Sequence, residues 1–475
     1  MCLATADLDA LRSKVRPFEE AELSLVRSLA DAVRWLGERD EHALRYALNL
    51  ASVTKLRAPD GADVEVEPLN DPYRQEILAP VTEALLSRDG VDRAATARLV
   101  GLLTPRAQAV RGALGSAFHG KIPAAEIERQ LCEKALVLVC GGGGGVGFAY
   151  LGAFELLEQF DLRPRLMAGT SMGAVLQLLR ARSPSYQPDE VEGAIRDLAF
   201  RQLFRILRSE SRYGLPATGQ LCLREEMGQH FRDPDGGTLT LDRLAIPMLV
   251  AVTGIRNGAL PHDPSYYEHL IDLRPRLFRR VNARGLSAML AAVGELVRQR
   301  DRFARIYLGA DPETRSFDAL DAVGFSSAVP GVVHYDVLRE DPRMHAMLQS
   351  LFRKHDLFRL VDGGLVDNVP ARAAWREIQR GALDTRNVFV LALDGFAPKL
   401  SQPLWYGIEQ LVAQNVARNR PFMHLYKAFQ GGLSPSEVMP RPSRLRLAIQ
   451  RGKQELFPDM PLVARMCRPF PPPSA

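Results

Sequence analysis

The sequence has few cysteines and no long hydrophobic run, and each of these shortages excludes a class of protein. Only five of the 475 residues are cysteine, and their spacing matches no metal-ligand pattern, so neither a disulfide framework nor a zinc site is expected. No stretch reaches the roughly 18 consecutive apolar residues of a membrane-spanning helix, and the first residues lack the basic and apolar regions of a signal peptide. We therefore expect a cytoplasmic chain with no transmembrane segment, either free or peripheral to a membrane, and signal-less secretion stays an open alternative.

Charge and composition exclude further classes. The net charge is +5, with 61 basic against 56 acidic residues, and 46% of the residues are hydrophobic. These proportions are typical of a folded globular chain, and so small an excess of positive charge does not indicate a nucleic-acid partner. A chain of this length is expected to form two or three domains.

Residues 1–132 have the pattern of helices. Apolar residues recur at helical spacing in four stretches, which are 23–36, 73–88, 91–103 and 123–133. Turn-forming residues at 58–61 separate the first helices from the others. We expect an all-α N-terminal domain, and packing against the rest of the chain or binding of a protein partner would both suit it.

Residues 133–400 change to strands that alternate with helices. A buried strand is predicted at 135–140, where six apolar residues precede a run of glycines, and further apolar runs occur at 246–254 and 387–395. This alternation is typical of a mostly parallel sheet that is covered by helices on both faces. The predicted fold class of this domain is therefore α/β.

Two further segments carry positive charge. Residues 265–320 are Arg-rich and predicted to be helical, and the portion 273–305 fits either a lid over an acyl pocket or a helix packed on the core. Residues 401–475 form a C-terminal helical or irregular extension, with five basic residues and no acid between 438 and 454. That basic segment suits either an anionic lipid surface or solvent, and the Pro-rich tail 468–475 is expected to fray.

A nucleophile motif follows the second predicted strand of the α/β domain. Gly169, Ser171 and Gly173 form G-x-S-x-G, after an apolar run and before a helical pattern. A serine hydroxyl reacts only when it is exposed beside a base, and this motif places the serine on a sharp strand-to-helix turn that the flanking glycines permit. The serine would then lie at the N-terminus of a helix, where amides favour developing negative charge.

A glycine string lies one strand earlier. Directly after the strand at 135–140, Gly142, Gly144 and Gly147 match G-x-G-x-x-G, the pattern of dinucleotide-binding loops. The next strand ends in Ser171 instead of a ribose-binding acid, which favours a second interpretation, in which bare glycine amides form an oxyanion hole. Consecutive strand–helix units bring both loops to the same edge of a parallel sheet.

A carboxylate motif completes the set. Asp362, Gly363 and Gly364 follow an apolar lead-in, so the carboxylate projects from a tight loop and is the candidate base for the serine. Asp367 and Asn368, which follow, are expected to be turn or cap residues.

The three motifs, in this order, resemble those of the patatin-like phospholipase family. The likeness extends to the segments 147–160, 246–254 and 324–333, and it covers roughly 134–398. It implies a three-layer α/β core, a Ser–Asp dyad and lipid acyl hydrolase activity on phospholipids or related esters at a membrane or micelle surface. No metal or organic cofactor is implied.

The resemblance also assigns roles to residues. Ser171 matches the nucleophile and Asp362 the base, and the oxyanion glycines match three positions, Gly142, Gly143 and Gly144. The family often has a basic residue just before the last glycine of its first motif, where this chain has Val146. The missing charge would weaken the support of the oxyanion loop.

Three alternatives stay open. A Ser–His–Asp triad would use His424, the only histidine after Asp362, with Asp362 or Asp394 as the acid. A partner-binding protein with a low-activity hydrolase core would place the function in 1–132. A dinucleotide-binding protein would use the glycine string without the serine.

Overall fold

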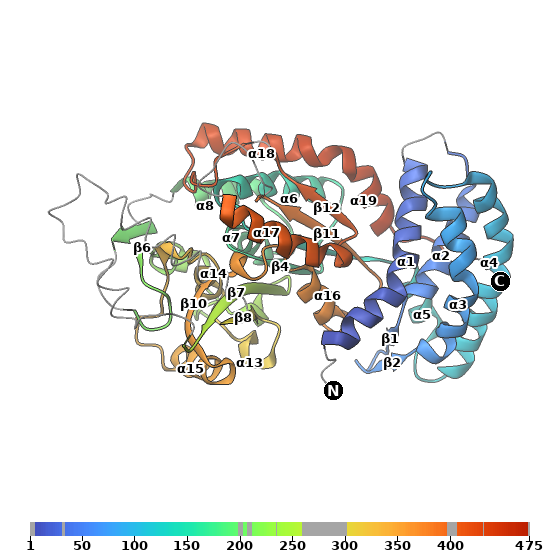
Figure 1. Ribbon diagram of the computed structural model, residues 1–475, viewed down its shortest axis with the longest axis horizontal. Helices are drawn as coiled ribbons and strands as arrows, with labels where there is room; N and C mark the ends of the chain where they lie inside the picture. Colours follow the sequence, from blue (N-terminus) through green and yellow to red (C-terminus); the bar gives the residue numbers. More distant parts are fainter. Residues whose placement is uncertain are drawn as a thin grey trace.

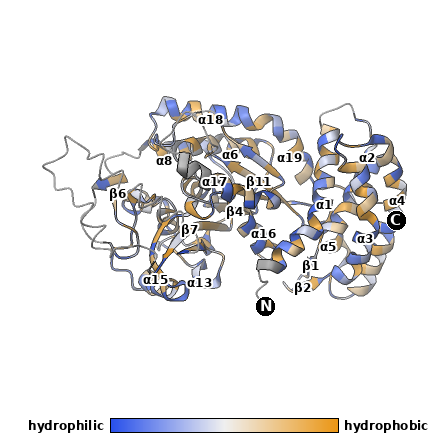
Figure 2. Ribbon diagram, in the orientation of Figure 1, coloured by the Kyte–Doolittle hydropathy of each residue, from blue (hydrophilic) through white to orange (hydrophobic). Residues whose placement is uncertain are grey.

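The computed structural model describes residues 5–30, 34–197, 203–206, 211–233, 235–258, 302–396, 406–430 and 432–473 (Figure 1). Five helices form the N-terminal region: α1 (Thr5–Ala30), α2 (Glu38–Ser52), α3 (Glu67–Leu85), α4 (Arg93–Ala117) and α5 (Ala124–Cys132). In Figure 2, α2, α3 and α4 alternate hydrophobic and hydrophilic residues, as expected for helices that share a core on one face. The helical prediction holds, except that the predicted turn carries a small hairpin of β1 (Lys55–Arg57) and β2 (Asp63–Glu65).

The central sheet is mostly parallel, as predicted. Five parallel strands follow one another across it in the order β7 (Met248–Arg256), β4 (Leu166–Gly169), β3 (Ala135–Cys140), β11 (Val388–Asp394) and β12 (Leu425–Ala428). Two antiparallel strands, β8 (Phe303–Leu308) and β10 (Leu357–Asp362), pair with β7. The α/β fold class is therefore confirmed.

Helices cover both faces of this sheet. Successive residues of β3 point to opposite sides, so Leu138 joins a core with α6 (Ala149–Gln159), α7 (Met172–Ala181) and α18 (Pro442–Leu456). Val139 joins a second core with α16 (Ala371–Gln379) and the start of α1. Figure 1 shows α6 and α18 on one side of the strands and α16 on the other. These are the three layers of the expected core.

The N-terminal helices are joined to the sheet by apolar and by charged contacts. Val15 of α1 packs against the sheet core, whereas Leu25 of the same helix belongs to the core of the helical region. Between them, the buried carboxylate of Glu22 lies 2.9 Å from both Arg45 Nε and Lys134 Nζ. The domain boundary at 132 stays a prediction, and α1 contributes to both sides of it.

The C-terminal extension is more ordered than its sequence predicts. The expected frayed tail instead packs on the N-terminal helices, where Phe470 is buried and Pro473 accepts a hydrogen bond from Arg111. The extension also supplies strand β12 to the sheet and helix α18, which lies against α6. Strand β12 was not predicted. It lies at the edge of the sheet, and because only its first residue, Leu425, is buried, it lacks the apolar run of a central strand.

The segment predicted as a helical insertion is only partly described. Within its described part, Phe303–Leu308 is strand β8 and not helix, with every second residue buried, and the short helix α13 (Pro312–Arg315) follows. The proposed lid at 273–305 lies mostly outside the described residues. A second, three-stranded sheet contains β5 (Phe204–Ile206), β6 (Ala217–Leu221) and β9 (Gly331–His334). The other α-helices in the described ranges are α8 (Pro188–Asp197), α10 (Leu223–Met227), α14 (Ala319–Ser326), α15 (Pro342–His355), α17 (Tyr406–Asn419) and α19 (Met460–Cys467).

Candidate active site

Ser171 lies on a sharp turn between β4 and α7. Its backbone has φ 52° and ψ −129°, a conformation that residues with a side chain rarely adopt. The glycines on either side are required by packing: a Cβ at Gly169 would lie 2.4 Å from Gln177 Oε1, and one at Gly173 would lie 2.4 Å from Gly141 O. The local structure is the strand–turn–helix that the G-x-S-x-G motif predicts.

A second serine holds this turn in place. The backbone N–H of Ser171 donates to Ser326 Oγ across 2.8 Å, and the Ser326 hydroxyl donates to the carbonyl of Ala251 across 2.7 Å. Ser326 is fully buried at the end of α14. Part of the conformational cost at Ser171 is thereby offset by a hydrogen bond that the sequence motif does not reveal.

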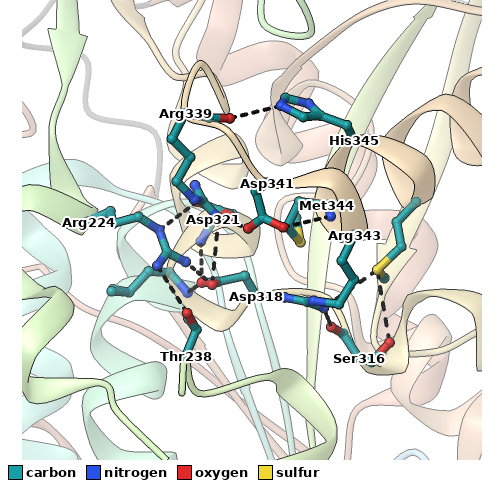
Figure 3. Close-up of polar contacts among 12 residues, drawn as sticks. Arg224, Thr238, Ser316, Asp318, Asp321, Arg339, Asp341, Arg343, Met344 and His345 are labelled. Carbon is teal, nitrogen blue, oxygen red and sulfur yellow. Dashed lines mark hydrogen bonds and ion pairs between the residues drawn. The ribbon is translucent and has the colours of Figure 1, made fainter. Parts of the chain in front are cut away.

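Buried carboxylates anchor the other end of α14 (Figure 3). Asp318 caps the helix by accepting from the Leu320 amide at 3.1 Å, and it forms an ion pair with Arg224. Asp321 accepts from Arg339 at 2.6 Å. Both carboxylates are fully buried, so removing a partner would leave an uncompensated charge. This cluster fixes the helix whose last residue contacts the nucleophile turn.

The register of β7 brings Asp362 next to the end of β4. Strand β8 pairs with β7 from Val250 to Ile255, so β4 and β10, whose pairings overlap that span, both lie on the other edge of β7. On that edge Gly169 pairs with Val250 and Asp362 with Val252. Two positions along a strand correspond to about 7 Å. The turn that carries Ser171 and the carboxylate therefore meet on the same edge.

Asp362 is a buried carboxylic acid with only partial hydrogen bonding. Its Oδ1 accepts from the Gly364 amide at 2.7 Å, while Oδ2 is buried without a hydrogen bond of standard geometry among the described residues. Burial raises the pKa of Asp362 to about 6, and hydrogen bonding to the Ser171 side chain and the Gly364 amide only partly opposes this rise. The group is thus a stronger base near neutral pH than an ordinary aspartate, and its Oδ2 is the oxygen that the Gly364 amide does not engage.

The glycine loop lies beside Ser171. A Cβ at Gly142 would lie 3.2 Å from the Cβ of Ser171. The amide of Gly142 is already engaged, because it donates to Asn368 Oδ1 at 3.1 Å, and the amide of Gly145 donates to Pro435 O at 3.1 Å. Within the described part of the chain, the amides of Gly143 and Gly144 have no acceptor.

Of the three predicted oxyanion glycines, Gly142 is therefore the one whose amide is engaged by another group. Gly147 has a packing role, since a Cβ there would lie 2.8 Å from Met172 Cγ. The carbonyl of Pro435 would lie 2.0 Å from a Cβ at Gly144. A carbonyl oxygen so close to the loop is unfavourable for a diphosphate and weakens the dinucleotide-binding interpretation.

Asp367 and Asn368, expected to be turn or cap residues, lie in the irregular segment after the 3₁₀ turn Gly363–Leu365, and both are buried and hydrogen-bonded. Asp367 accepts from Tyr307 Oη at 2.6 Å and from Asn419 Nδ2 at 2.8 Å, and its carbonyl accepts from Thr170 Oγ1 at 2.9 Å. The sequence carries one signal for this burial. Both polar residues stand between Val366 and Val369, which are buried as well.

Val146, where the family often has a basic residue, is buried in the apolar core beside α6. A charged side chain in this environment would be costly. The loop is instead held by its backbone contacts with Asn368 and Pro435.

His424 has partners far from the nucleophile turn. Its Nδ1 accepts from the backbone N–H of Val390 at 2.9 Å, and its Nε2 lies 3.1 Å from Glu19 Oε2. Both nitrogens are therefore committed to a contact between α1 and the sheet, and the described residues show no contact of His424 with Ser171 or Asp362. This arrangement weakens the triad alternative.

Metal clusters and membrane-spanning helices are both absent from the described residues. Among them, no group of three His, Cys, Asp or Glu side chains could hold a metal ion. None of the helices in the described ranges is both long and apolar enough to cross a membrane.

The fold and the site define an α/β protein with a serine on a strand-to-helix turn beside a buried carboxylate. More particularly, the chain belongs to the patatin-like phospholipase family, whose model matches residues 138–375, half of the chain. The resemblance drawn from the three motifs is therefore confirmed. The match ends before β11, β12 and α18, which complete the sheet and cover it.

Curated relatives match a short part of the chain. Proteins named lysophospholipase nte1 from Aspergillus fumigatus and Emericella nidulans are 37% and 39% identical to it over 62 residues. The matched stretch is 13% of this chain and only 4% of each relative.

Proposed function

We propose that this chain is a lipid acyl hydrolase that cleaves carboxylic ester bonds of phospholipids or related lipids through a Ser171–Asp362 dyad. The observation that carries the proposal is the meeting of a conformationally constrained serine with a buried carboxyl of raised pKa on one edge of β7. Membership of the patatin-like phospholipase family supports the same chemistry.

The proposed reaction has two steps. In the first, Asp362 Oδ2 accepts the Ser171 proton while Oγ attacks the ester carbonyl, and the tetrahedral intermediate expels the alcohol, which takes the proton from Asp362. In the second, Asp362 removes a proton from water, the hydroxide attacks the acyl-serine, and the proton returns to Ser171 as the carboxylic acid leaves. Each step restores the carboxylate that began it, so no external acid or base is consumed.

Negative charge on the carbonyl oxygen is stabilised by the glycine loop in this proposal. The amides of Gly143 and Gly144 are the donors, because the amide of Gly142 is engaged by Asn368. Each such donor typically contributes about a hundredfold or more in rate. The N-terminus of α7 adds a favourable dipole at the same place.

The substrate class follows from the relatives as a proposal. Two of them are named lysophospholipase, so monoacyl phospholipids are the first candidates and diacyl phospholipids the second. Such lipids are presented in micelles or membranes, so we propose that the enzyme acts at a membrane or micelle surface. No nucleic acid or cofactor takes part in the proposed reaction.

The decisive experiment combines covalent labelling with product analysis. One sample each of wild-type protein, Ser171→Ala and Asp362→Asn is treated with a fluorophosphonate. A second, unlabelled sample of each is offered monoacyl and diacyl phosphatidylcholine, and fatty acid release is measured. We expect labelling and hydrolysis in the wild type, neither in Ser171→Ala, and a loss of at least about a thousandfold in Asp362→Asn. Hydrolysis by Ser171→Ala, or full activity of Asp362→Asn, would overturn the proposal.

A further inference from the structure

Asn368 lies between the two loops that carry the proposed catalytic groups. Its side chain is buried, and its Oδ1 would lie 2.8 Å from a Cβ at Gly142 and 3.4 Å from one at Gly364. The side chain therefore fits against the glycine loop only because residue 142 is glycine, and it is in ordinary van der Waals range of Gly364 in the Asp362 loop.

The orientation of the Asn368 amide is set by its second partner. Its Nδ2 donates to Asp394 Oδ1 at 3.2 Å, and Asp394 also accepts from Tyr426 Oη at 2.6 Å and from the Phe396 amide at 2.9 Å. A carboxylate offers only acceptors, so it faces the NH₂ group of Asn368. The carbonyl oxygen of the side chain is then turned to the Gly142 amide, which is the hydrogen bond observed at 3.1 Å.

The hydrogen bond between Gly142 and Asn368 constrains the backbone of the glycine loop. Because the Gly142 amide donates to Asn368, it is not free to bind a substrate oxygen, and the following two residues carry the amides that have no acceptor among the described residues. Gly143 and Gly144 adopt positive φ of 154° and 53°, which turns their backbone relative to that of Gly142. A shift of Gly142 would be passed directly to both donors, since they follow it in the chain.

We propose that Asn368 is a positioning residue, which holds the Gly142 amide so that the amides of Gly143 and Gly144 face the oxygen of the substrate, with Asp394 and Tyr426 fixing its orientation from behind. The proposal rests on the proposed hydrolase function. It assigns an active-site task to residues of the chain beyond 375, where the family match ends, because Asp394 is at the end of β11 and Tyr426 is in β12.

The first test removes the side chain. Asn368→Ala is assayed with a soluble short-chain ester, together with Asn70→Ala as the matched control. Asn70 is also a fully buried asparagine, its Nδ2 donates to two backbone carbonyls, and it lies in α3, in the N-terminal helical region. Both variants are expected to melt at lower temperature, but only Asn368→Ala should lose kcat, by about a hundredfold at nearly unchanged KM.

The second test replaces the amide of Asn368 with a carboxyl group of nearly the same size. Asn368→Asp places a second carboxyl beside Asp394, with Tyr426 and Asp362 as the other titratable groups near it. When both carboxylates are ionised they repel each other, whereas a single shared proton allows one to donate to the other and the loop contact to re-form. The ratio of variant to wild-type kcat/KM should therefore rise as the pH falls from about 8 to about 6.

The double variant Asn368→Asp, Asp394→Asn provides the rescue. It exchanges carboxylate and amide, so the amide at position 394 donates to the carboxylate at 368, which still accepts from Gly142. Activity above that of either single variant is the expected result. A flat pH ratio together with no rescue, or an Asn368→Ala variant with wild-type kcat, would overturn the positioning role.

These outcomes are distinct from a failure of the proposed function. If wild-type protein hydrolyses no ester and is not labelled at Ser171, the hydrolase proposal itself fails. If the wild type is active and Asn368→Ala is equally active, the hydrolase proposal stands and the positioning role is wrong. Equal loss of kcat in Asn70→Ala would show that the effect is a general consequence of destabilisation, and it would also overturn the positioning role.

Discussion

The backbone N–H of Ser171 donates a hydrogen bond to the hydroxyl of Ser326 across 2.8 Å. The two residues are 155 positions apart in the chain, yet this contact holds the turn on which the proposed nucleophile lies. Because φ of Ser171 is 52°, the turn stores conformational energy and needs external support.

We predict that Ser326→Ala will lower kcat by about 10- to 100-fold, because the unsupported turn will relax and displace the nucleophile. Ser327→Ala is the matched control, since the Ser327 hydroxyl is buried without a hydrogen-bond partner among the described residues. Steady-state kinetics on a soluble ester and the rate of fluorophosphonate labelling check the prediction. Equal rates in the two variants would show that Ser326 does not support the turn.

The raised pKa of Asp362 predicts the pH dependence of catalysis. The carboxyl must be ionised to accept the serine proton, and burial places its pKa at about 6. The kcat/KM of the wild type should therefore rise with pH and reach half of its maximum near pH 6. A profile already flat down to about pH 4, the range of an unperturbed aspartate, would contradict the burial argument.

The same pKa has a consequence for stability. In the folded state the pKa of Asp362 lies above its usual value of 3.8, so the folded protein binds the proton more tightly than the unfolded chain. Ionisation then opposes folding, with no effect below about pH 4 and a full cost, up to about 3 kcal/mol, above pH 6. Asp362→Asn should be more stable than wild type at pH 7.5 and lose this advantage near pH 4. Urea unfolding at both pH values measures the difference, and a less stable variant at pH 7.5 would contradict the prediction.

His424 offers a test between a dyad and a triad. In the structure its two nitrogens serve Val390 and Glu19, so we expect His424→Ala to lose about 2–3 kcal/mol of stability, because the buried N–H of Val390 loses its acceptor. The labelling rate of the folded variant at low temperature should stay within a few-fold of wild type. A hundredfold slower rate in a fully folded variant would favour a triad.

The parts of the site that could be predicted from the sequence are those in which one short segment contains both the functional residue and the residues that shape its backbone. The turn at Ser171 and the loop at Asp362 each depend on glycines next to the functional residue, so the local pattern contains the necessary information. The parallel sheet was equally accessible, because strands buried on both faces give continuous apolar runs such as Ala135–Cys140.

The unpredicted parts depend on contacts between distant segments. Ser326 and Asn368 look like ordinary polar residues in sequence, and only the register of β7 and β11 brings them to the nucleophile turn and the glycine loop. Strand β12 was missed because it is a short edge strand with one buried residue, so its sequence gives neither a continuous apolar run nor a clear alternation. The burial of Phe470 was missed because proline and polar neighbours dominate the tail in which it lies.

Helix α18 attaches the C-terminal extension to the α/β domain by packing against α6. Gly452 of α18 lies so close to α6 that an added Cβ would lie 2.0 Å from the carbonyl oxygen of Ala149, and Gly152 of α6 faces Ile449 in the same way. The two helices therefore pack through glycines, and α6 begins directly after the 3₁₀ turn Gly144–Phe148 that continues the glycine loop.

Gly452→Ala should force α18 away from α6 and lower the free energy of unfolding by about 2 kcal/mol or more, because no side chain fits between the two backbones. Gly101→Ala is the matched control, since that glycine is inside α4 with open space around its Cα, and alanine there should stabilise the helix by about 0.5–1 kcal/mol. Urea unfolding of both variants measures the two effects. Because α6 carries the glycine loop, Gly452→Ala should also slow fluorophosphonate labelling under conditions in which it is folded. If Gly452→Ala were as stable as wild type and equally fast to label, the C-terminal extension would be only loosely attached, and its contacts with the glycine loop would not contribute to catalysis.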